Sequence, residues 1–261
     1  MFHQAFRTVP TLSTISRTEI LEAMAALAGD PFQGIRERRW VSADEGGVDL
    51  QERAARSALR AAGLEPRDVD FVLGSSLVPD QLNAPDVCAT HERLRLRPDC
   101  FTMKGDAVCN SFQMQLRLAE GLFASGPMRR GLLLQCSVAS RTVPMESPWS
   151  VHFGDGATAV VVEPCEGPEG LLHQGHRTDG SLHEAMVLTV NERRWWEDGR
   201  ITATPLDRDA ARRMFLSVAD VGRELLEAVF ERAGVGPDDI DFFAAHQPTQ
   251  WCAASFRSTS A

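Results

Sequence analysis

The stretch AGLEPRDVDFVLGSS at residues 62–76 decides the fold, because residues 233–247, AGVGPDDIDFFAAHQ, repeat its pattern. The alanine, glycine, proline, two aspartates and first phenylalanine coincide at a constant offset, and each copy follows a long amphipathic helix pattern, at 50–62 and 207–233. Glycine suits the end of a helix, and the apolar run after the turn suits a buried strand. The repeat predicts two similar α/β halves around a pseudo-twofold axis. Two unrelated junctions that merely share turn chemistry are the alternative.

Working outward, the first half contains a cysteine at the expected start of an amphipathic helix, in DAVCNSFQMQLRLAEGLFASG at residues 106–126. An apolar stripe runs behind Cys109 at three- and four-residue steps, formed by Phe112, Leu116, Ala119 and Phe123. At a helix N-terminus the backbone dipole and the unpaired amides lower a thiol pKa, which favours a nucleophilic thiolate. The alternative is a free cysteine that packs as a small hydrophobic residue.

Two strand patterns follow this helix, RRGLLLQCSVASR at 129–141 and FGDGATAVVVEP at 153–164. Gly154 and Gly156 flank Asp155 in a turn that needs backbone freedom near a crowded site. Taken alone, the GDG triplet indicates only a turn into a strand, and no helix follows it as a phosphate loop would require.

The second copy of the repeat predicts a strand over DIDFFAA, residues 239–245, with His246 at its carboxyl end. Functional groups in open parallel sheets gather at that end, and the duplication allows His246 to face Cys109. Cysteine with histidine suggests acyl chemistry, in which a thiolate attacks a carbonyl and the histidine supplies a proton or an oxyanion donor. A buried structural histidine is the alternative.

Residues 165–206 give no clear pattern and could form a cap, a partner surface or a loop. The segment contains three histidines, but no cysteine or carboxylate stands at ligand spacing, so we expect no metal and regard them as loop residues: His173, His176 and His183.

Composition limits the function further. A net charge of −9 argues against nucleic-acid binding, and the longest apolar runs are too short to span a membrane. Six scattered cysteines without an N-terminal signal indicate reduced thiols, so we expect a cytoplasmic protein. Lys104 is the only lysine, whereas arginines form local clusters, for example around Arg36. Such a cluster is either solvated surface charge or a site that recognises an acidic partner or a phosphate.

Six stretches, GIRERRW, AGLEPRDVDFVLGSS, DAVCNSF, SVASR, FGDGATAVVV and DIDFFAAHQP, occur in the order found in β-ketoacyl-acyl carrier protein synthase III. The resemblance covers roughly residues 30–250. It implies a thiolase-like fold, a five-layered α/β/α/β/α sandwich of two duplicated halves. The nucleophile would lie in the half formed by residues 1–165 and the histidine in the half formed by residues 166–261.

The resemblance also implies roles for individual residues. Cys109 would accept the acyl group, and His246 would stabilise the enolate formed when malonyl loses carbon dioxide. Backbone amides of Cys109 and of the FGDGA turn would bind the oxyanion. Substrate-binding positions would be Phe112, Gly154, Gly156, Arg36 and Thr249.

The implied function is an acyltransferase that passes an acyl group from cysteine to a malonyl-derived carbanion or to a hydroxyl or amine, in fatty-acid-like or polyketide metabolism. It would need no cofactor beyond its acyl-coenzyme A or acyl carrier protein substrate, and would act as a homodimer or with a homologue. The family continues to a further segment that completes the site, whereas this sequence stops at FRSTSA, so we expect an incomplete second half. A catalytically silent partner subunit and a Cys-His thioester hydrolase are the alternative functions.

Overall fold

The computed structural model describes residues 35–144, 150–167, 169–244 and 246. They belong to two compact units, one spanning Glu37–Glu169 and the other joining Met1–Arg36 to Gly170–Ala261. The division at residue 165 into two thiolase-like halves stays a prediction.

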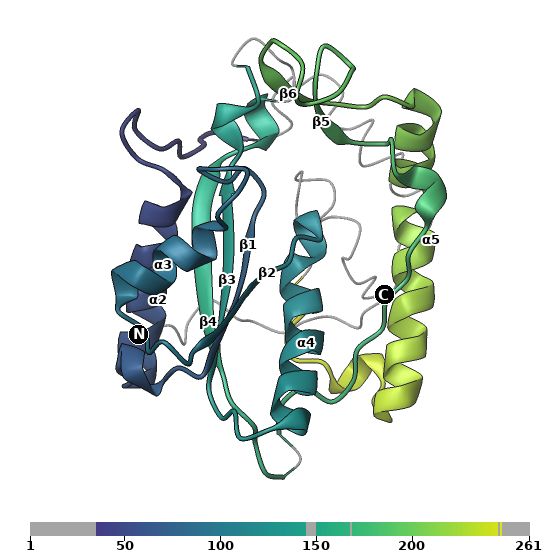
Figure 1. Ribbon diagram of the computed structural model, residues 1–261. Coiled ribbons are helices and arrows are strands. Elements are labelled where there is room, and N and C mark those ends of the chain that lie inside the picture. The colour runs from purple at the N-terminus through teal and green to yellow at the C-terminus, as the bar shows by residue number, and fades with distance from the viewer. Residues whose placement is uncertain (1–34, 145–149, 168, 245, 247–261) are drawn as a thin grey trace. The chain divides into compact units, whose positions relative to one another are not determined.

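A four-stranded mixed sheet forms the centre of the unit Glu37–Glu169 (Figure 1). Its strands, in the order β2-β1-β3-β4, are Phe101–Lys104, Phe71–Ser76, Gly131–Val138 and Asp155–Val162. β1 runs parallel to both β2 and β3, whereas β4 is antiparallel to β3. Every residue of β1 is buried, as expected for a central parallel strand covered on both faces.

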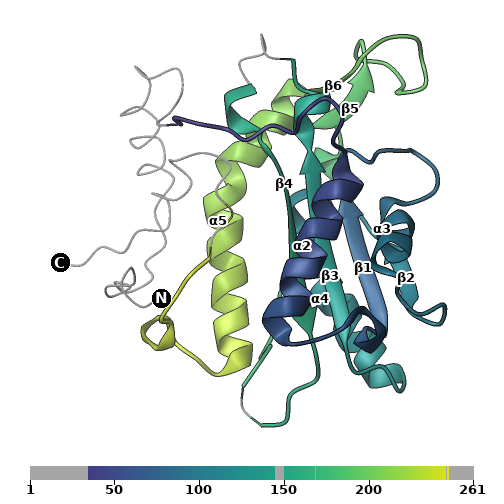
Figure 2. The same ribbon diagram turned by 90° about the vertical axis from the view of Figure 1, so that its left-hand side faces the viewer.

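Three helices cover this sheet (Figures 1 and 2). α2, Gly47–Ala62, and α3, Asp86–Leu94, lie on one face, and α4, Ser111–Ser125, lies on the other. Neighbouring strand residues point to opposite faces, so each face has its own apolar cluster. The cluster under α2 and α3 includes Ala55, Leu59, Val72, Val87, Leu94, Leu132 and Leu134.

The second cluster packs α4 against the sheet. Phe71, Leu73 and Leu133 of the strands meet the helix there. The helix contributes the predicted apolar stripe, which is thereby confirmed: Phe112, Leu116, Ala119 and Phe123. The rings of Phe71 and Phe123 meet edge to face, with centroids 5.3 Å apart.

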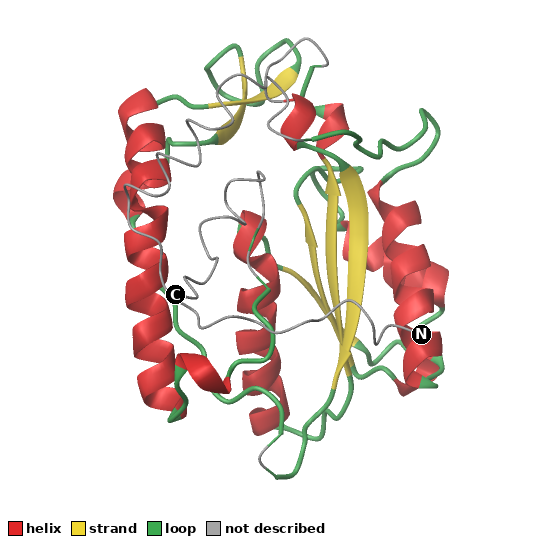
Figure 3. Cartoon of the chain, turned by 180° about the vertical axis from the view of Figure 1, so that it is seen from behind, coloured by secondary structure: helices red, strands yellow, loops and turns green. Residues whose placement is uncertain are grey.

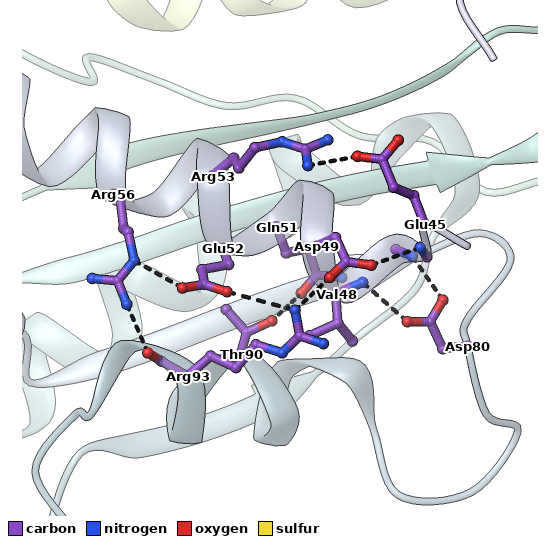
Figure 4. A network of polar contacts seen from close by, with 12 residues as sticks. Glu45, Val48, Asp49, Gln51, Glu52, Arg53, Arg56, Asp80, Thr90 and Arg93 are labelled. Atoms are coloured by element: carbon purple, nitrogen blue, oxygen red, sulfur yellow. Dashed lines mark hydrogen bonds and ion pairs between the residues drawn. The ribbon is translucent and has the colours of Figure 1, made fainter. Parts of the chain in front are cut away.

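Polar contacts fix α2 against its neighbours (Figure 4). The carboxylate of Asp80 accepts hydrogen bonds from the first two backbone amides of α2, at 2.7 and 3.2 Å. Arg93 of α3 donates to Asp49 at 2.5 Å, and the buried Thr90 hydroxyl donates to Gln51 at 3.0 Å. Since a buried amide without a partner costs free energy, the Thr90–Gln51 contact helps to set how α2 and α3 lie together.

The other unit contains a hairpin and a long helix (Figure 3). β5, Val187–Val190, pairs antiparallel with β6, Ile201–Thr204. α5, Arg208–Ala233, begins where Asp207 accepts hydrogen bonds from the amides of Asp209 and Ala210. None of the helices described here is long and apolar enough to cross a membrane.

The two copies of the repeat have the same local structure at their helix ends. α2 ends at Gly63 with φ 66° and ψ 28°, and α5 ends at Gly234 with φ 69° and ψ 29°. A short 3-10 helix follows each, at Pro66–Asp68 and Pro237–Asp239. Glycine is needed at both helix ends because only it takes the left-handed conformation without strain.

After this shared turn the copies differ. The first continues into β1, but residues 240–244 form no strand, and Phe242 is 61% exposed. The predicted strand over DIDFFAA is therefore wrong for the part of it that the structure describes. A strand requires a hydrogen-bonded neighbour, and none of the described strands pairs with this segment.

Gly131 tests the packing of the sheet against α4. A Cβ atom there would lie 2.1 Å from the ring of Phe71, so Gly131→Ala should lower the free energy of unfolding by about 1–3 kcal/mol. Gly121→Ala, within α4, is the matched control, because its Cβ would meet no atom within 4 Å. The control should raise stability by about 0.5–1 kcal/mol. Urea unfolding followed by circular dichroism measures the stability of both variants. A Gly131→Ala midpoint equal to that of the wild type would contradict this packing.

Candidate active site

Cys109 lies in a tight turn between β2 and α4. The turn includes a 3-10 helix, Val108–Asn110, and α4 begins only at Ser111, so the predicted helix start at the cysteine is two residues early. Val108 has φ +50°, a left-handed conformation that is unusual for a β-branched residue. Left-handed backbone costs roughly 1–2 kcal/mol per residue and persists where surrounding contacts impose it. We call residues 105–110 the elbow.

Contacts at the carboxyl ends of β1 and β2 fasten the start of the elbow. The amide of Gly105 donates to the carbonyl of Gly74 at 2.9 Å. The carboxylate of Asp106 accepts from the amide of Ser76 at 2.8 Å and lies 3.3 Å from the Lys104 ammonium. Because β1 is fully buried, these bonds tie the elbow to a rigid strand. Sequence reasoning missed Asp106, since nothing in its spacing indicated that it reaches back to β1.

The thiol of Cys109 does not have the low pKa predicted for a helix N-terminus. Although the residue is exposed, partial burial of its sulfur raises the thiol pKa above the ordinary value, and a hydrogen bond with its own backbone opposes this only in part. The helix dipole acts mainly within the first turn of a helix, and Cys109 precedes α4. At neutral pH the thiol is therefore mostly protonated.

Cys136 is the other cysteine near this end of the sheet, and it is a poor nucleophile. The residue is only 6% exposed, and burial raises its pKa to about 12. Its thiol donates to the carbonyl of Gly47 at 3.6 Å. Among the two, only Cys109 is accessible to a substrate.

Asp155, the centre of the GDG triplet, joins three segments that are distant in sequence. One carboxylate oxygen accepts from the amide of Val41 at 2.9 Å and from the hydroxyl of Ser140 at 2.5 Å. The other accepts from the amide of Ser140 at 3.0 Å, and the amide of Asp155 donates to the carbonyl of Arg39 at 2.7 Å. Asp155 thus fixes the end of β3 and the 39–41 segment at the same edge of the sheet as the elbow.

The two glycines around Asp155 have different surroundings. A Cβ on Gly154 would lie 3.3 Å from both Arg38 and the carbonyl of Arg39, so a side chain there would require its neighbours to move by a few tenths of an ångström. Gly156 has open space and already belongs to β4, opposite Ser137. Because the Asp155 amide is already bonded, it is not available as an oxyanion donor, and oxyanion binding by the other amides of this turn stays a prediction. Substrate binding by Gly154 and Gly156 stays a prediction.

The remaining predicted site residues are placed as follows. Phe112 is half-buried and packs into the cluster under α4, so part of its surface is structural. Arg36 is exposed, and Thr249 lies outside the described residues. His246 belongs to the other compact unit, so its pairing with Cys109 stays a prediction.

His246 is neutral at physiological pH. Although the residue is exposed, burial of its ring lowers its pKa below the ordinary imidazole value of about 6.5. A neutral ring has one nitrogen that accepts a proton and one that donates a hydrogen bond. Both roles predicted for this histidine are therefore chemically open.

The three histidines of the 165–206 segment differ in how far they are buried. His173 is half-buried, whereas His176 and His183 are exposed. Across the described ranges, no group of three or more histidine, cysteine, aspartate or glutamate side chains could hold a metal ion.

The pH dependence of Cys109 alkylation tests the effect of burial on its thiol. Only the thiolate reacts, so the rate of iodoacetamide labelling should rise through a midpoint above that of N-acetylcysteine measured alongside. Mass spectrometry of the peptide containing Cys109 gives the rate at each pH. A midpoint below that of N-acetylcysteine would mean that the helix dipole outweighs burial after all.

Comparison with known proteins places these features in a family. The family model described as 3-oxoacyl-[acyl-carrier-protein] synthase III matches residues 105–180, which include the elbow, α4 and the GDG triplet. The β-ketoacyl-[acyl-carrier-protein] synthase III of Chelativorans sp. is 31% identical over 220 residues, which is 82% of this chain and 66% of the relative. The synthase III of Erythrobacter litoralis is 31% identical over 218 residues, which is again 82% of this chain and 66% of the relative. The chain thus spans 66% of the length of these curated relatives.

Solved structures of such synthases have a similar fold. The β-ketoacyl-[acyl-carrier-protein] synthase III of Thermus thermophilus superposes with a TM-score of 0.72 at 25% identity, over 85% of this chain and 68% of that one. The priming β-ketosynthase of the R1128 polyketide biosynthetic pathway gives a TM-score of 0.73 at 25% identity, over 95% of this chain and 74% of that one. The predicted thiolase-like α/β fold is confirmed. By its sequence and its fold, the chain belongs to the β-ketoacyl-[acyl-carrier-protein] synthase III family.

Proposed function

We propose that this chain is an acyltransferase of the β-ketoacyl-acyl carrier protein synthase III type, with Cys109 as its nucleophile. The observation that carries the proposal is the elbow, which holds an exposed cysteine in a strained turn at the carboxyl edge of a buried parallel sheet. Strained turns cluster at active sites, and ligands bind at the carboxyl ends of strands. Family membership supports the same assignment.

The first half-reaction loads the enzyme. Cys109 loses its proton, and its sulfur attacks the carbonyl carbon of an acyl thioester, so that a new carbon–sulfur bond forms and the donor thiol leaves with a proton. The raised pKa of the Cys109 thiol means that a base is needed, and the lowered pKa of His246 leaves its ring neutral and able to accept the proton. The donor is acyl-coenzyme A or an acyl carrier protein, and the backbone amide of Cys109 is the candidate oxyanion donor.

The second half-reaction discharges the acyl group. In the condensing version, a malonyl thioester loses carbon dioxide, and the resulting enolate carbon attacks the acyl-cysteine and releases the Cys109 thiolate. His246 would hydrogen-bond to the enolate oxygen. A hydroxyl or amine acceptor would use the same acyl-enzyme. The likeness to a priming β-ketosynthase of a polyketide pathway supports a role in fatty-acid-like or polyketide metabolism. The assembly would be a homodimer or a heterodimer with a homologue.

One observation favours a second candidate, a catalytically silent partner subunit of an active homologue. The Cys109 thiol is largely protonated at neutral pH, which reduces its reactivity unless a base acts on it. Such a subunit would bind its homologue and load no acyl group.

Intact mass spectrometry after incubation with short acyl-coenzyme A and acyl carrier protein thioesters tests the proposal. The wild type should gain the mass of one acyl group, and Cys109→Ala should gain none. Cys88→Ala is the matched control, because Cys88 is also exposed and lies in the same unit, and it should load normally. A folded wild type that gains no mass from any donor would favour the silent subunit.

His246→Ala tests the proposed role of the histidine in decarboxylation. Loss of the enolate hydrogen bond should slow decarboxylation of malonyl carrier protein by about 10²–10³-fold. Release of labelled carbon dioxide measures the decarboxylation rate. An unchanged decarboxylation rate would remove His246 from the proposed mechanism.

A further inference from the structure

Ser111, the first residue of α4, lies against the elbow. It is only 3% exposed. Its hydroxyl accepts a hydrogen bond from the amide of Ala107 at 3.0 Å and donates one to the carbonyl of Val108 at 2.8 Å. One side chain thus binds the backbone on both sides of the bond that joins Ala107 to Val108.

These bonds do not serve ordinary helix capping. A capping serine precedes the helix and accepts from amides two or three residues later, in the first turn. Ser111 instead accepts from a residue four positions earlier, and α4 begins without a side-chain cap at Asn110. The hydroxyl therefore acts on the elbow and not on the helix.

The bonded groups surround the strained residue. The Ala107 amide and the Val108 carbonyl flank the left-handed dihedral of Val108, φ +50°. Holding both groups to a single oxygen fixes their separation, which restricts the rotation of Val108. The next residue is Cys109, so the direction in which its side chain leaves the backbone depends on this restriction.

A second contact keeps Ser111 itself in place. Gln115 lies one turn further along the same face of α4, is 2% exposed, and donates to the carbonyl of Leu134 in β3 at 3.1 Å. Its side-chain oxygen also accepts from Gln135 of the same strand. The beginning of α4 is thus bonded to the sheet one turn after Ser111, which supports the Ser111 hydroxyl.

We propose that Ser111 is a positioning residue that holds the elbow so that Cys109 presents its sulfur to the acyl thioester. The role in acyl loading rests on the proposed function, whereas the hold on the elbow does not. Ser111 acts through the backbone and touches no substrate.

The test compares Ser111→Ala with Ser125→Ala. The control lies on the same helix and its hydroxyl also donates to a carbonyl three residues earlier, that of Leu122, but it is exposed and far along the helix from the elbow. Two reactions of Cys109 are measured at several pH values: alkylation by iodoacetamide and loading from acyl-coenzyme A. Melting temperature is recorded for each variant.

Ser111→Ala should load acyl groups at least 10-fold more slowly than the wild type. Its alkylation midpoint should move down toward that of N-acetylcysteine, because a loosened elbow exposes the sulfur to water. Ser125→Ala should match the wild type in both reactions. If Ser111→Ala matches the wild type in both, the proposal is overturned. If the wild type itself loads no acyl group, the proposed function fails, and the alkylation profile still tests the hold on the elbow.

A second variant covers the case in which Ser111→Ala does not fold. Glycine takes a left-handed dihedral without strain, so Val108→Gly removes the backbone strain that the Ser111 hydrogen bonds are proposed to hold in place. The double variant Ser111→Ala/Val108→Gly should then fold and melt close to the wild-type temperature, and its alkylation midpoint should lie below that of the wild type. A melting temperature that does not recover would show that Ser111 is not needed for the Val108 conformation.

Discussion

The parallel pairing of β1 with β2 and β3 is the constraint on which the described site depends. Parallel strands end at the same edge of a sheet, so the segments that follow them leave the core together. The antiparallel β4 begins at that edge, which brings Asp155 beside the end of β3. Burial of β1 on both faces makes this arrangement rigid, since shifting the strand would expose its apolar side chains.

The regular elements of the first unit could be predicted from sequence, because their side chains follow simple periods. The stripe behind Cys109 repeats at helical spacing, and the apolar runs of β1 and β3 suit strands covered on both faces. The ends of helices at Gly63 and Gly234 were equally readable, since few residues adopt their backbone conformation. These features depend on local chemistry alone.

The elbow could not be predicted in the same way. No sequence rule places a valine at positive φ, and the contacts that hold the elbow come from Asp106, which bonds to β1, and from Ser111 at the start of α4. The pKa of Cys109 was predicted in the wrong direction for a related reason. The helix dipole can be read from spacing, whereas burial of a sulfur requires the folded chain. The strand expected at residues 240–244 fails similarly, because strand formation depends on a neighbour and not on propensity alone.

The ion pair between Lys104 and Asp106 has a practical consequence for chemical labelling. Lys104 is the only lysine of the chain, and it lies at the end of β2, immediately before the elbow. An amine-directed fluorophore would therefore attach at one side chain only, apart from the N-terminus, and would sit five residues from Cys109 in sequence. The partial burial of the Lys104 side chain, which is 21% exposed, would make the rate of labelling sensitive to opening of the elbow. The composition of this chain thus supplies a single reporter group beside the turn that holds Cys109.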